Sequence, residues 1–272
     1  YKDYNWMMDF TERLLEHCAN EVNGTTKAVF GEHQIDFKAP YPRVTMADAI
    51  KKFTGFDITG KSEQEIREAA KGMGIDVNDS MGKGKLIDEI FGEKCEGNFI
   101  QPTFITDYPI EMSPLTKKHR DNPELTERFE LMVCGKEVAN AYSELNDPID
   151  QRERFEDQLK LSEKGDDEAM FIDQDFLRAL EYGMPPTSGL GIGMDRLIMF
   201  LTNNASIQEV LFFPQMRPEK NEPTVELSDD EKTIVSLLAD GQLLLGDAKE
   251  KSGLSGKKWD TATKALRSKN LI

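Results

Sequence analysis

Ten residues, Thr187-Ser-Gly-Leu-Gly-Ile-Gly-Met-Asp-Arg196, decide the fold of this 272-residue chain. Leu190–Ile192 is apolar and precedes a helical run at Arg196–Leu201, so we expect a buried strand that leads into a helix. Glycines alternate with the apolar residues and remove side chains from one face of the strand, which allows a flat ligand such as adenine to lie against the backbone. These are Gly189, Gly191 and Gly193.

Arg196 adds a fixed positive charge at the start of the helix, a favourable place for an anion. The glycine spacing is not GxGxxG, and no acidic residue follows a second strand at the required distance, which excludes a Rossmann nucleotide site. Tight packing of the strand on the helix explains the glycines equally well but leaves Arg196 unexplained. We therefore treat Gly191, Gly193 and Arg196 as candidate nucleotide-binding residues.

A hairpin upstream carries two carboxylates. Phe129–Val133 and Lys136–Leu145 read as strands around a turn at Cys134-Gly135. Met132 then lies opposite Glu137, and Glu130 and Glu137 share a face as diagonal neighbours. Two carboxylates this close repel each other unless a positive charge lies between them, and Mg²⁺ prefers such oxygen ligands. Neutralisation by Lys136 and Arg128 on a solvated edge explains the pair equally well.

Three more polar residues alternate along the second strand of this hairpin: Asn140, Tyr142 and Glu144. Alternation puts them on one face, where an amide, a phenol and a carboxylate form a recognition surface. An exposed strand face is the simpler explanation when this pattern is taken alone. Asn140 and Glu137 differ in strand parity, so a pocket that contains both requires a bulge or a strong twist.

The remaining pattern favours an antiparallel α+β sheet over a doubly wound one, because strands paired by hairpins are interrupted by helices. Residues 45–98 read as a small helical insertion with glycine-rich turns. We expect helices at Tyr4–Val22, Thr45–Phe53, Glu63–Met73, Gly84–Phe91, Asp150–Lys164 and Glu168–Glu181. We expect strands at Lys27–Phe30, Gln34–Phe37 and Phe99–Thr106, the first two around a Gly31-Glu-His33 turn.

The last residues form a separate small module in this interpretation. Arg217–Pro223 reads as a linker, and residues 224–272 contain three helical segments: Asp229–Ala239, Leu245–Lys251 and Lys257–Lys269. This layout is typical of a helix-turn-helix or winged-helix module. The module carries 8 Lys/Arg and 8 Asp/Glu, so residues 1–223 carry the whole net charge of −16. The basic last segment is explained equally well by a nucleic-acid contact or by a solvated helix face.

Composition narrows the class of protein. The net charge of −16 argues against nonspecific binding to nucleic acid or to anionic membranes over the whole surface. The three cysteines are scattered, which indicates neither a disulfide framework nor a zinc site and favours a cytoplasmic protein. No apolar run approaches the roughly 20 residues of a membrane span, so we expect no membrane partner.

Together these motifs resemble the class II aminoacyl-tRNA synthetases, and specifically the lysine branch of that family. The glycine-rich strand with Asp195-Arg196 is similar to the third motif of the class. The lysine branch is indicated by four further stretches, Gln101-Pro-Thr-Phe-Ile-Thr-Asp-Tyr-Pro109, Glu111-Met-Ser-Pro-Leu115, Ser143-Glu-Leu-Asn-Asp147 and Gly165-Asp-Asp-Glu-Ala-Met170. The resemblance covers residues 1–220.

The resemblance implies a lysine–tRNA ligase with lysine, ATP and tRNA(Lys) as partners and Mg²⁺ as cofactor. Glu130 and Glu137 would bind magnesium and ATP, with Gly191 and Gly193 beside the nucleotide. Arg196 would hold the triphosphate, which gives Arg196 and Glu137 the catalytic roles. The lysine pocket would contain Asn140, Tyr142 and Glu144.

The first two motifs of the class and its anticodon-binding domain are expected upstream of Tyr1, which suggests a C-terminal fragment with half of the active site. We therefore expect the full-length enzyme to be a homodimer and this chain to be inactive alone. Two alternatives stay open at this point. One is a truncated paralogue that lysylates a protein, and the other is a non-catalytic regulator that senses lysine or a nucleotide.

Overall fold

The computed structural model describes residues 1–163, 172–215, 227–238, 245–269 and 271–272. The chain divides into two compact units, Tyr1–Pro214 and Gln215–Ile272. The motif at 165–170 and the linker at 217–223 lie outside the described residues.

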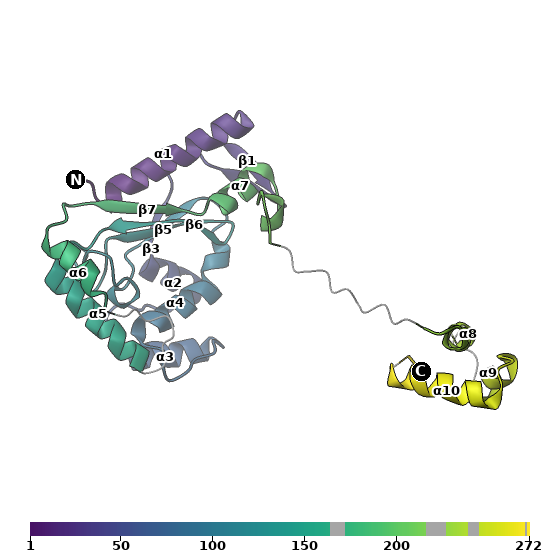
Figure 1. Ribbon diagram of the computed structural model, residues 1–272. Coiled ribbons are helices and arrows are strands. Elements are labelled where there is room, and N and C mark those ends of the chain that lie inside the picture. Colours follow the sequence, from purple (N-terminus) through teal and green to yellow (C-terminus); the bar gives the residue numbers. More distant parts are fainter. Residues whose placement is uncertain (164–171, 216–226, 239–244, 270) are drawn as a thin grey trace. The chain divides into compact units, whose positions relative to one another are not determined.

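A five-stranded sheet forms the centre of the first unit, with strand order β3-β4-β5-β6-β7 (Figure 1). All neighbouring strands are antiparallel except β3 and β4, which are parallel. The expected mixed α+β fold with an antiparallel sheet is thus confirmed, and the parallel strand at one edge is an addition. The strands are β3 (Arg43–Thr45), β4 (Thr103–Thr106), β5 (Arg128–Val133), β6 (Lys136–Ser143) and β7 (Ser188–Ile192).

The β5–β6 hairpin contains the bulge that the site requires. Met132 lies opposite Glu137, as predicted, but Leu131 lies opposite Ala139, so Val138 is the extra residue of β6. Val138 and Ala139 are consequently both buried in one apolar core, although they are consecutive. The bulge corrects the parity difference and puts Glu137 on the face that Asn140 occupies.

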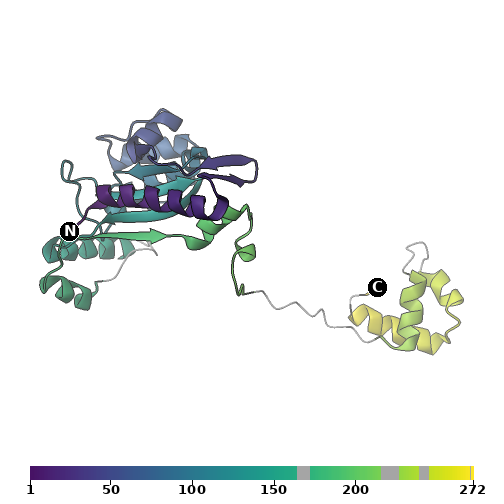
Figure 2. The same cartoon turned by 90° about the horizontal axis from the view of Figure 1, so that it is seen from above.

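That apolar core fills one face of the sheet. Helix α1 (Tyr4–Asn23) lies across this face, together with the β1–β2 hairpin and α7 (Met194–Thr202), as Figures 1 and 2 show. Fully buried phenylalanines such as Phe104 and Phe129 contribute about 1.5–3 kcal/mol each. Asp3 caps α1 by accepting a hydrogen bond from the Trp6 amide at 3.1 Å.

The small hairpin pairs β1 (Lys27–Phe30) with β2 (His33–Asp36). The second strand therefore begins one residue earlier than predicted, and His33 is a strand residue opposite Phe30 rather than a turn residue. The ring of Phe30 packs edge-on against that of Phe200 in α7, with centroids 4.7 Å apart. This contact ties the hairpin to the helix that carries Arg196.

Three helices pack as a second core against the opposite face of the sheet, around Ile105, Tyr108 and Met132 (Figure 1). Thr45 caps the first helix, as expected, and a Ser62–Glu65 capping box starts the second. The helices are α2 (Met46–Thr54), α3 (Glu63–Gly72) and α4 (Lys83–Lys94). A short 3-10 turn, η1 (Glu96–Asn98), follows them and another, η2 (Ile110–Met112), packs on α4.

Helices α5 (Pro148–Glu163) and α6 (Gln174–Glu181) contact each other, and the ring centroids of Phe155 and Phe176 lie 5.9 Å apart. The second helix was predicted from residue 168 but begins at Gln174, because the Asp173 carboxylate caps the amides of Asp175 and Phe176. A last 3-10 turn of this unit is η3 (Ile207–Glu209).

The second unit contains α8 (Asp229–Leu238), α9 (Leu245–Lys251) and α10 (Gly256–Ser268), close to the predicted bounds. Its core is formed by Ile234, Ala248, Trp259, Ala262 and Leu266. Among the described residues of the whole chain, no helix is long and apolar enough to cross a membrane.

Candidate active site

The glycine strand lies beside the polar strand in a register that clears one face. Gly191 pairs with Asn140 and Gly189 with Tyr142, so the glycines share the face of these two side chains. Leu190 and Ile192 point the other way and pack against the apolar core. The predicted removal of side chains from one face of the strand is therefore what the structure shows.

Gly189 leaves room for the side chain of Glu144. A Cβ placed on Gly189 would meet Oε1 of Glu144 at a distance no real Cβ contact shows, so the carboxylate lies directly over this glycine. The Glu144 amide donates to the Thr187 carbonyl at 2.8 Å, which anchors the residue beside β7. The nearest atom to a Cβ on Gly191 is the Asn140 carbonyl oxygen at 3.7 Å, an ordinary contact. No atom of the described residues therefore comes closer than an ordinary contact to the space over Gly191.

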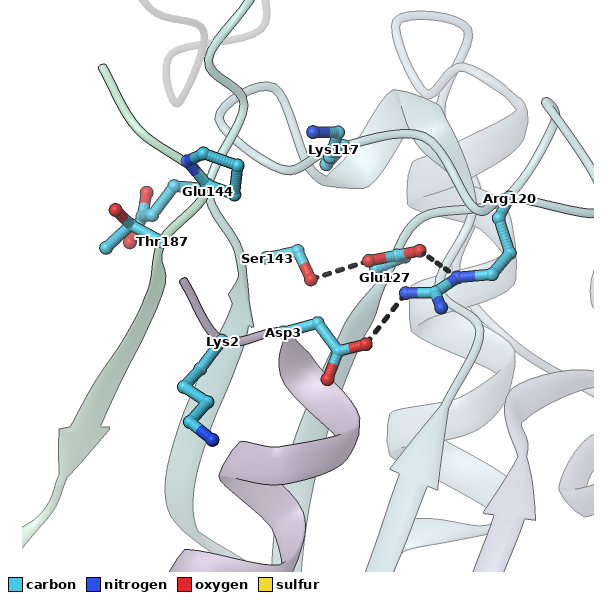
Figure 3. A pocket seen from close by; sticks show the side chains of 9 residues that line it. Lys2, Asp3, Lys117, Arg120, Glu127, Ser143, Glu144 and Thr187 are labelled. Carbon is cyan, nitrogen blue, oxygen red and sulfur yellow. Dashed lines mark hydrogen bonds and ion pairs between the residues drawn. The ribbon is translucent and has the colours of Figure 1, made fainter.

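Glu144 is a half-buried carboxylate at the end of β6. It forms no ion pair with any residue that the structure describes, and burial raises its pKa. Figure 3 shows it beside Thr187 at the rim of a cavity of about 400 Å³, whose lining residues Ser143 and Glu127 lie on the face opposite to Tyr142. A half-buried carboxylate binds a positively charged ligand more strongly than a neutral one. Burial and the charge of Glu144 also raise the pKa of Tyr142 on the same face.

Glu130 is held by two neighbours on the same face. Its Oε1 accepts hydrogen bonds from Nη2 of Arg128 at 2.6 Å and from Nδ2 of Asn140 at 3.2 Å. Burial raises the pKa of Glu130, which Arg128 lowers and the charge of Glu137 raises again. Arg128 therefore does neutralise the charge of Glu130, as one of the two explanations required. The side chains of Arg128 and Glu130 are each only 16% exposed, so the pair does not lie on a solvated edge of the sheet.

Arg196 binds the bulge rather than a carboxylate. Its Nη1 donates to the Glu137 carbonyl at 2.5 Å, and the Gly193 amide donates to the Val138 carbonyl at 2.8 Å. The first turn of α7 is thus joined to β6 at the bulge. The guanidinium stands next to Glu137 with donors left for an anion.

Glu130 and Glu137 would supply only two protein ligands to a metal ion. No cluster of three or more His, Cys, Asp or Glu that could hold a metal occurs in the described part of the chain. Glu130 and Glu137 are hard oxygen donors on one face, and the charge of Glu137 raises the pKa of Glu130. This pair fits Mg²⁺ when further oxygens come from phosphates and water.

Two sets of side-chain contacts did not follow from the sequence patterns. Arg128 was considered only as a counter-charge, yet it bonds to both Glu130 and Asn140. Its parity with Glu130 two residues later was the available signal. On the opposite face, hydrogen bonds and ion pairs that no sequence motif predicted connect Ser143, Glu127, Arg120 and Asp3 (Figure 3).

The arrangement of strand, bulge and arginine-bearing helix belongs to a known class. A family model for the class II tRNA synthetases (D, K and N) matches residues 1–217. The chain belongs to this family.

Curated relatives refine the comparison. The chain is 77% identical to a lysine–tRNA ligase of Christiangramia forsetii over all of the chain and 48% of the relative. It is 74% identical to a lysine–tRNA ligase of Porphyromonas gingivalis over 82% of the chain and 39% of that protein. A lysine–tRNA ligase of Azobacteroides pseudotrichonymphae is 68% identical over 81% of the chain and 44% of its own length. The chain thus spans about half the length of the curated relatives it matches.

Proposed function

We propose that this chain is part of a lysine–tRNA ligase, which activates lysine with ATP and transfers it to tRNA(Lys). The observation that carries the proposal is Glu144, a carboxylate lying over Gly189 on the face of Asn140 and Tyr142, with no ion pair among the residues that the structure describes. Relatives of 68–77% identity that are named lysine–tRNA ligases support it.

Lysine recognition is assigned to Asn140, Tyr142 and Glu144. The carboxylate of Glu144 would accept a charge-assisted hydrogen bond from the ε-ammonium group of lysine. An uncharged side chain would leave the half-buried carboxylate unpaired, and ornithine, one methylene shorter, would not reach it. The pocket therefore selects by charge and by reach.

Nucleotide binding is assigned to Glu130, Glu137, Gly191, Gly193 and Arg196. Arg196 would hold the triphosphate, and the open face at Gly191 would accept adenine. The two carboxylates would hold Mg²⁺, which neutralises phosphate charge when bound. The lysine carboxylate then attacks the α-phosphorus, giving lysyl-adenylate and pyrophosphate, and the tRNA 3′ end takes the lysyl group. The protein acts here through positioning and charge stabilisation.

The boundaries of this part are proposed as residues 1–220, with an insertion at 45–98. The family match to residue 217 and the compact unit ending at Pro214 support them. We further propose that the whole protein is a cytoplasmic homodimer, and that this chain alone neither activates lysine nor charges tRNA efficiently. Robust lysine-dependent pyrophosphate exchange by the chain alone would overturn the last statement.

The direct test is calorimetric binding of lysine, ornithine and norleucine to the chain extended upstream to the length of its relatives. Lysine should bind, ornithine should bind on the order of tenfold or more weakly, and norleucine should not bind measurably. Equal affinity for lysine and norleucine would remove Glu144 from substrate recognition.

For residues 224–272 we propose a helix-turn-helix type of module that contacts RNA. The outward face of α10, opposite Trp259 and Leu266, carries Lys257 and Lys264. These two lysines have no ion pair within the described residues, whereas Lys258 and Lys269 pair with Asp230 and Glu231.

The test compares charge reversals in the chain. Lys257→Glu with Lys264→Glu should weaken tRNA binding and flatten its dependence on salt. The control is Lys52→Glu with Lys71→Glu in the insertion, which should have little effect. If both pairs act alike, the module is a packing or protein-binding domain, and the non-catalytic regulator alternative loses its nucleic-acid contact.

A further inference from the structure

Arg128 stands at the centre of the polar face. Its Nη2 donates to Oε1 of Glu130 at 2.6 Å, and its Nε donates to Oδ1 of Asn140 at 3.3 Å. Asn140 closes the triangle, because its Nδ2 donates to the same Glu130 oxygen at 3.2 Å. One guanidinium thus joins a residue assigned to the metal with a residue assigned to lysine.

The guanidinium is fixed from the other side by groups that take no part in binding. Its Nη1 donates to the Met112 carbonyl at 3.1 Å and to Oγ of Ser113 at 3.0 Å. The carbon of the guanidinium lies 4.5 Å from the centre of the Tyr108 ring, a cation–π contact with a fully buried side chain. Arg128 itself has little freedom to move, so it can impose a position on its partners.

Two consequences follow for Glu130. Oε1 already has two donors, which leaves Oε2 as the oxygen available to a cation. The positive charge of Arg128 also offsets one of the two negative charges of Glu130 and Glu137, so the three groups together carry a net −1. A bare divalent ion would therefore be held less tightly here than by two carboxylates without a neighbouring cation.

We propose that Arg128 is a positioning residue that couples the metal carboxylate Glu130 to the lysine-pocket amide of Asn140. It orients the Asn140 side chain for the amino acid and keeps Glu130 as a one-oxygen ligand. Both halves rest on the proposed function, the Asn140 half through lysine and the Glu130 half through the metal, and Mn²⁺ without nucleotide tests the Glu130 half separately.

Arg128→Met separates this role from a structural one. Without the guanidinium the carboxylate pair carries −2, so Mn²⁺ without nucleotide should bind this chain on the order of tenfold more tightly. Lysine should bind the upstream-extended chain on the order of tenfold more weakly, because Asn140 loses its orienting partner. A merely structural role would weaken both.

Two further variants serve as controls: Arg128→Lys separates the charge of Arg128 from its geometry, and Arg154→Met tests for damage to the fold. Lysine at position 128 keeps the charge but not the planar fork, so the Mn²⁺ affinity should return towards wild type while the lysine affinity stays low. Arg154 has a side chain 8% exposed and donates to the Ser113 carbonyl and to Asp150. Arg154→Met should lower the melting temperature and leave both affinities unchanged, which controls for damage to the shared loop.

Three results would overturn the proposal. One is a wild-type chain that does not bind Mn²⁺, since Glu130 would then have no metal to be positioned for. Another is Arg128→Met with both affinities unchanged, and the third is a loss of both that Arg154→Met reproduces. If the extended wild-type chain binds Mn²⁺ but not lysine, the proposed function and the Asn140 half fail together. The Mn²⁺ titration then still decides the Glu130 half.

Discussion

The carboxylate of Glu144 lies over the α-carbon of Gly189, in the space that any other side chain at position 189 would fill. Glu144 follows β6 and Gly189 belongs to the glycine strand β7, so the two stretches that define the site meet at this contact. A side chain at position 189 would therefore move the carboxylate of Glu144, so the position of this carboxylate can be tested without changing Glu144 itself.

Gly189→Ala should displace the Glu144 side chain and weaken lysine binding on the order of tenfold or more, while the fold persists. Gly191→Ala is the matched control, since its added Cβ meets only the Asn140 carbonyl oxygen at 3.7 Å. Gly191→Ala should spare lysine binding and weaken ATP binding. Calorimetry on the upstream-extended chain reads both, and equal loss of lysine binding in the two variants would contradict the assignment.

Lysine affinity should fall as the pH is lowered. Burial raises the pKa of Glu144 in the folded protein, so its carboxyl group gains a proton at a higher pH than an ordinary glutamate. The charged form that binds lysine is present above that pKa and is lost as the pH falls through it. Titration of lysine affinity from pH 8 to pH 4 measures this, and an affinity independent of pH would contradict it.

The same shift gives a stability prediction of opposite sign. A raised pKa means that the folded state holds the proton more tightly, so this group favours folding below its unfolded pKa, and the contribution is lost as the pH rises through the folded pKa. Glu144→Gln removes the charge and should therefore be at least as stable as wild type at pH 7. Thermal melts at pH 7 and pH 4 test this, and a large loss of stability at pH 7 alone would refute it.

Arg120 should matter for folding more than its exposure suggests. It pairs at 2.7 Å with Glu127, whose side chain is 5% exposed and also accepts from Oγ of Ser143. Arg120→Ala leaves this buried carboxylate without its cation and should cost about 1–3 kcal/mol in urea unfolding. The exposed Arg43–Asp9 pair is the control, and Arg43→Ala should cost roughly 1 kcal/mol or less. Equal losses would show that the burial of Glu127 is unimportant.

The second unit should unfold separately from the first. Trp259 is 5% exposed in a small core. Trp259→Ala should lower the free energy of unfolding of this unit by roughly 3–5 kcal/mol, which is about the whole stability of a module of this size. Limited proteolysis should then remove residues after 214 and leave the first unit intact. Simultaneous loss of both units would contradict two independent cores.

Sequence patterns predicted the strands of the site and their register well. Met132 opposite Glu137 followed from a two-residue turn, and the need for a bulge followed from the parity of Glu137 and Asn140. Both inferences work because side-chain direction in a strand is fixed by position.

Other features depend on contacts that no local pattern announces. Strand β3 has three residues and pairs in parallel with β4, with partners 61 positions apart such as Arg43 and Phe104, so its existence follows from tertiary packing. The strand predicted from Phe99 begins only at Thr103, because the carbonyls of Phe99 and Ile100 bond instead to the turn amides of Gly135 and Cys134. The role of Arg128 depends on Met112 and Tyr108 from a separate loop, which parity cannot reveal.

The most direct measurement is ATP–pyrophosphate exchange with each of the twenty amino acids, using the chain extended upstream to the length of its relatives. We expect exchange with lysine only, abolished by Glu144→Gln in protein that still binds ATP. Exchange with another amino acid, or lysine exchange that survives Glu144→Gln, would contradict the lysine pocket. No exchange with any amino acid would contradict the ligase function itself.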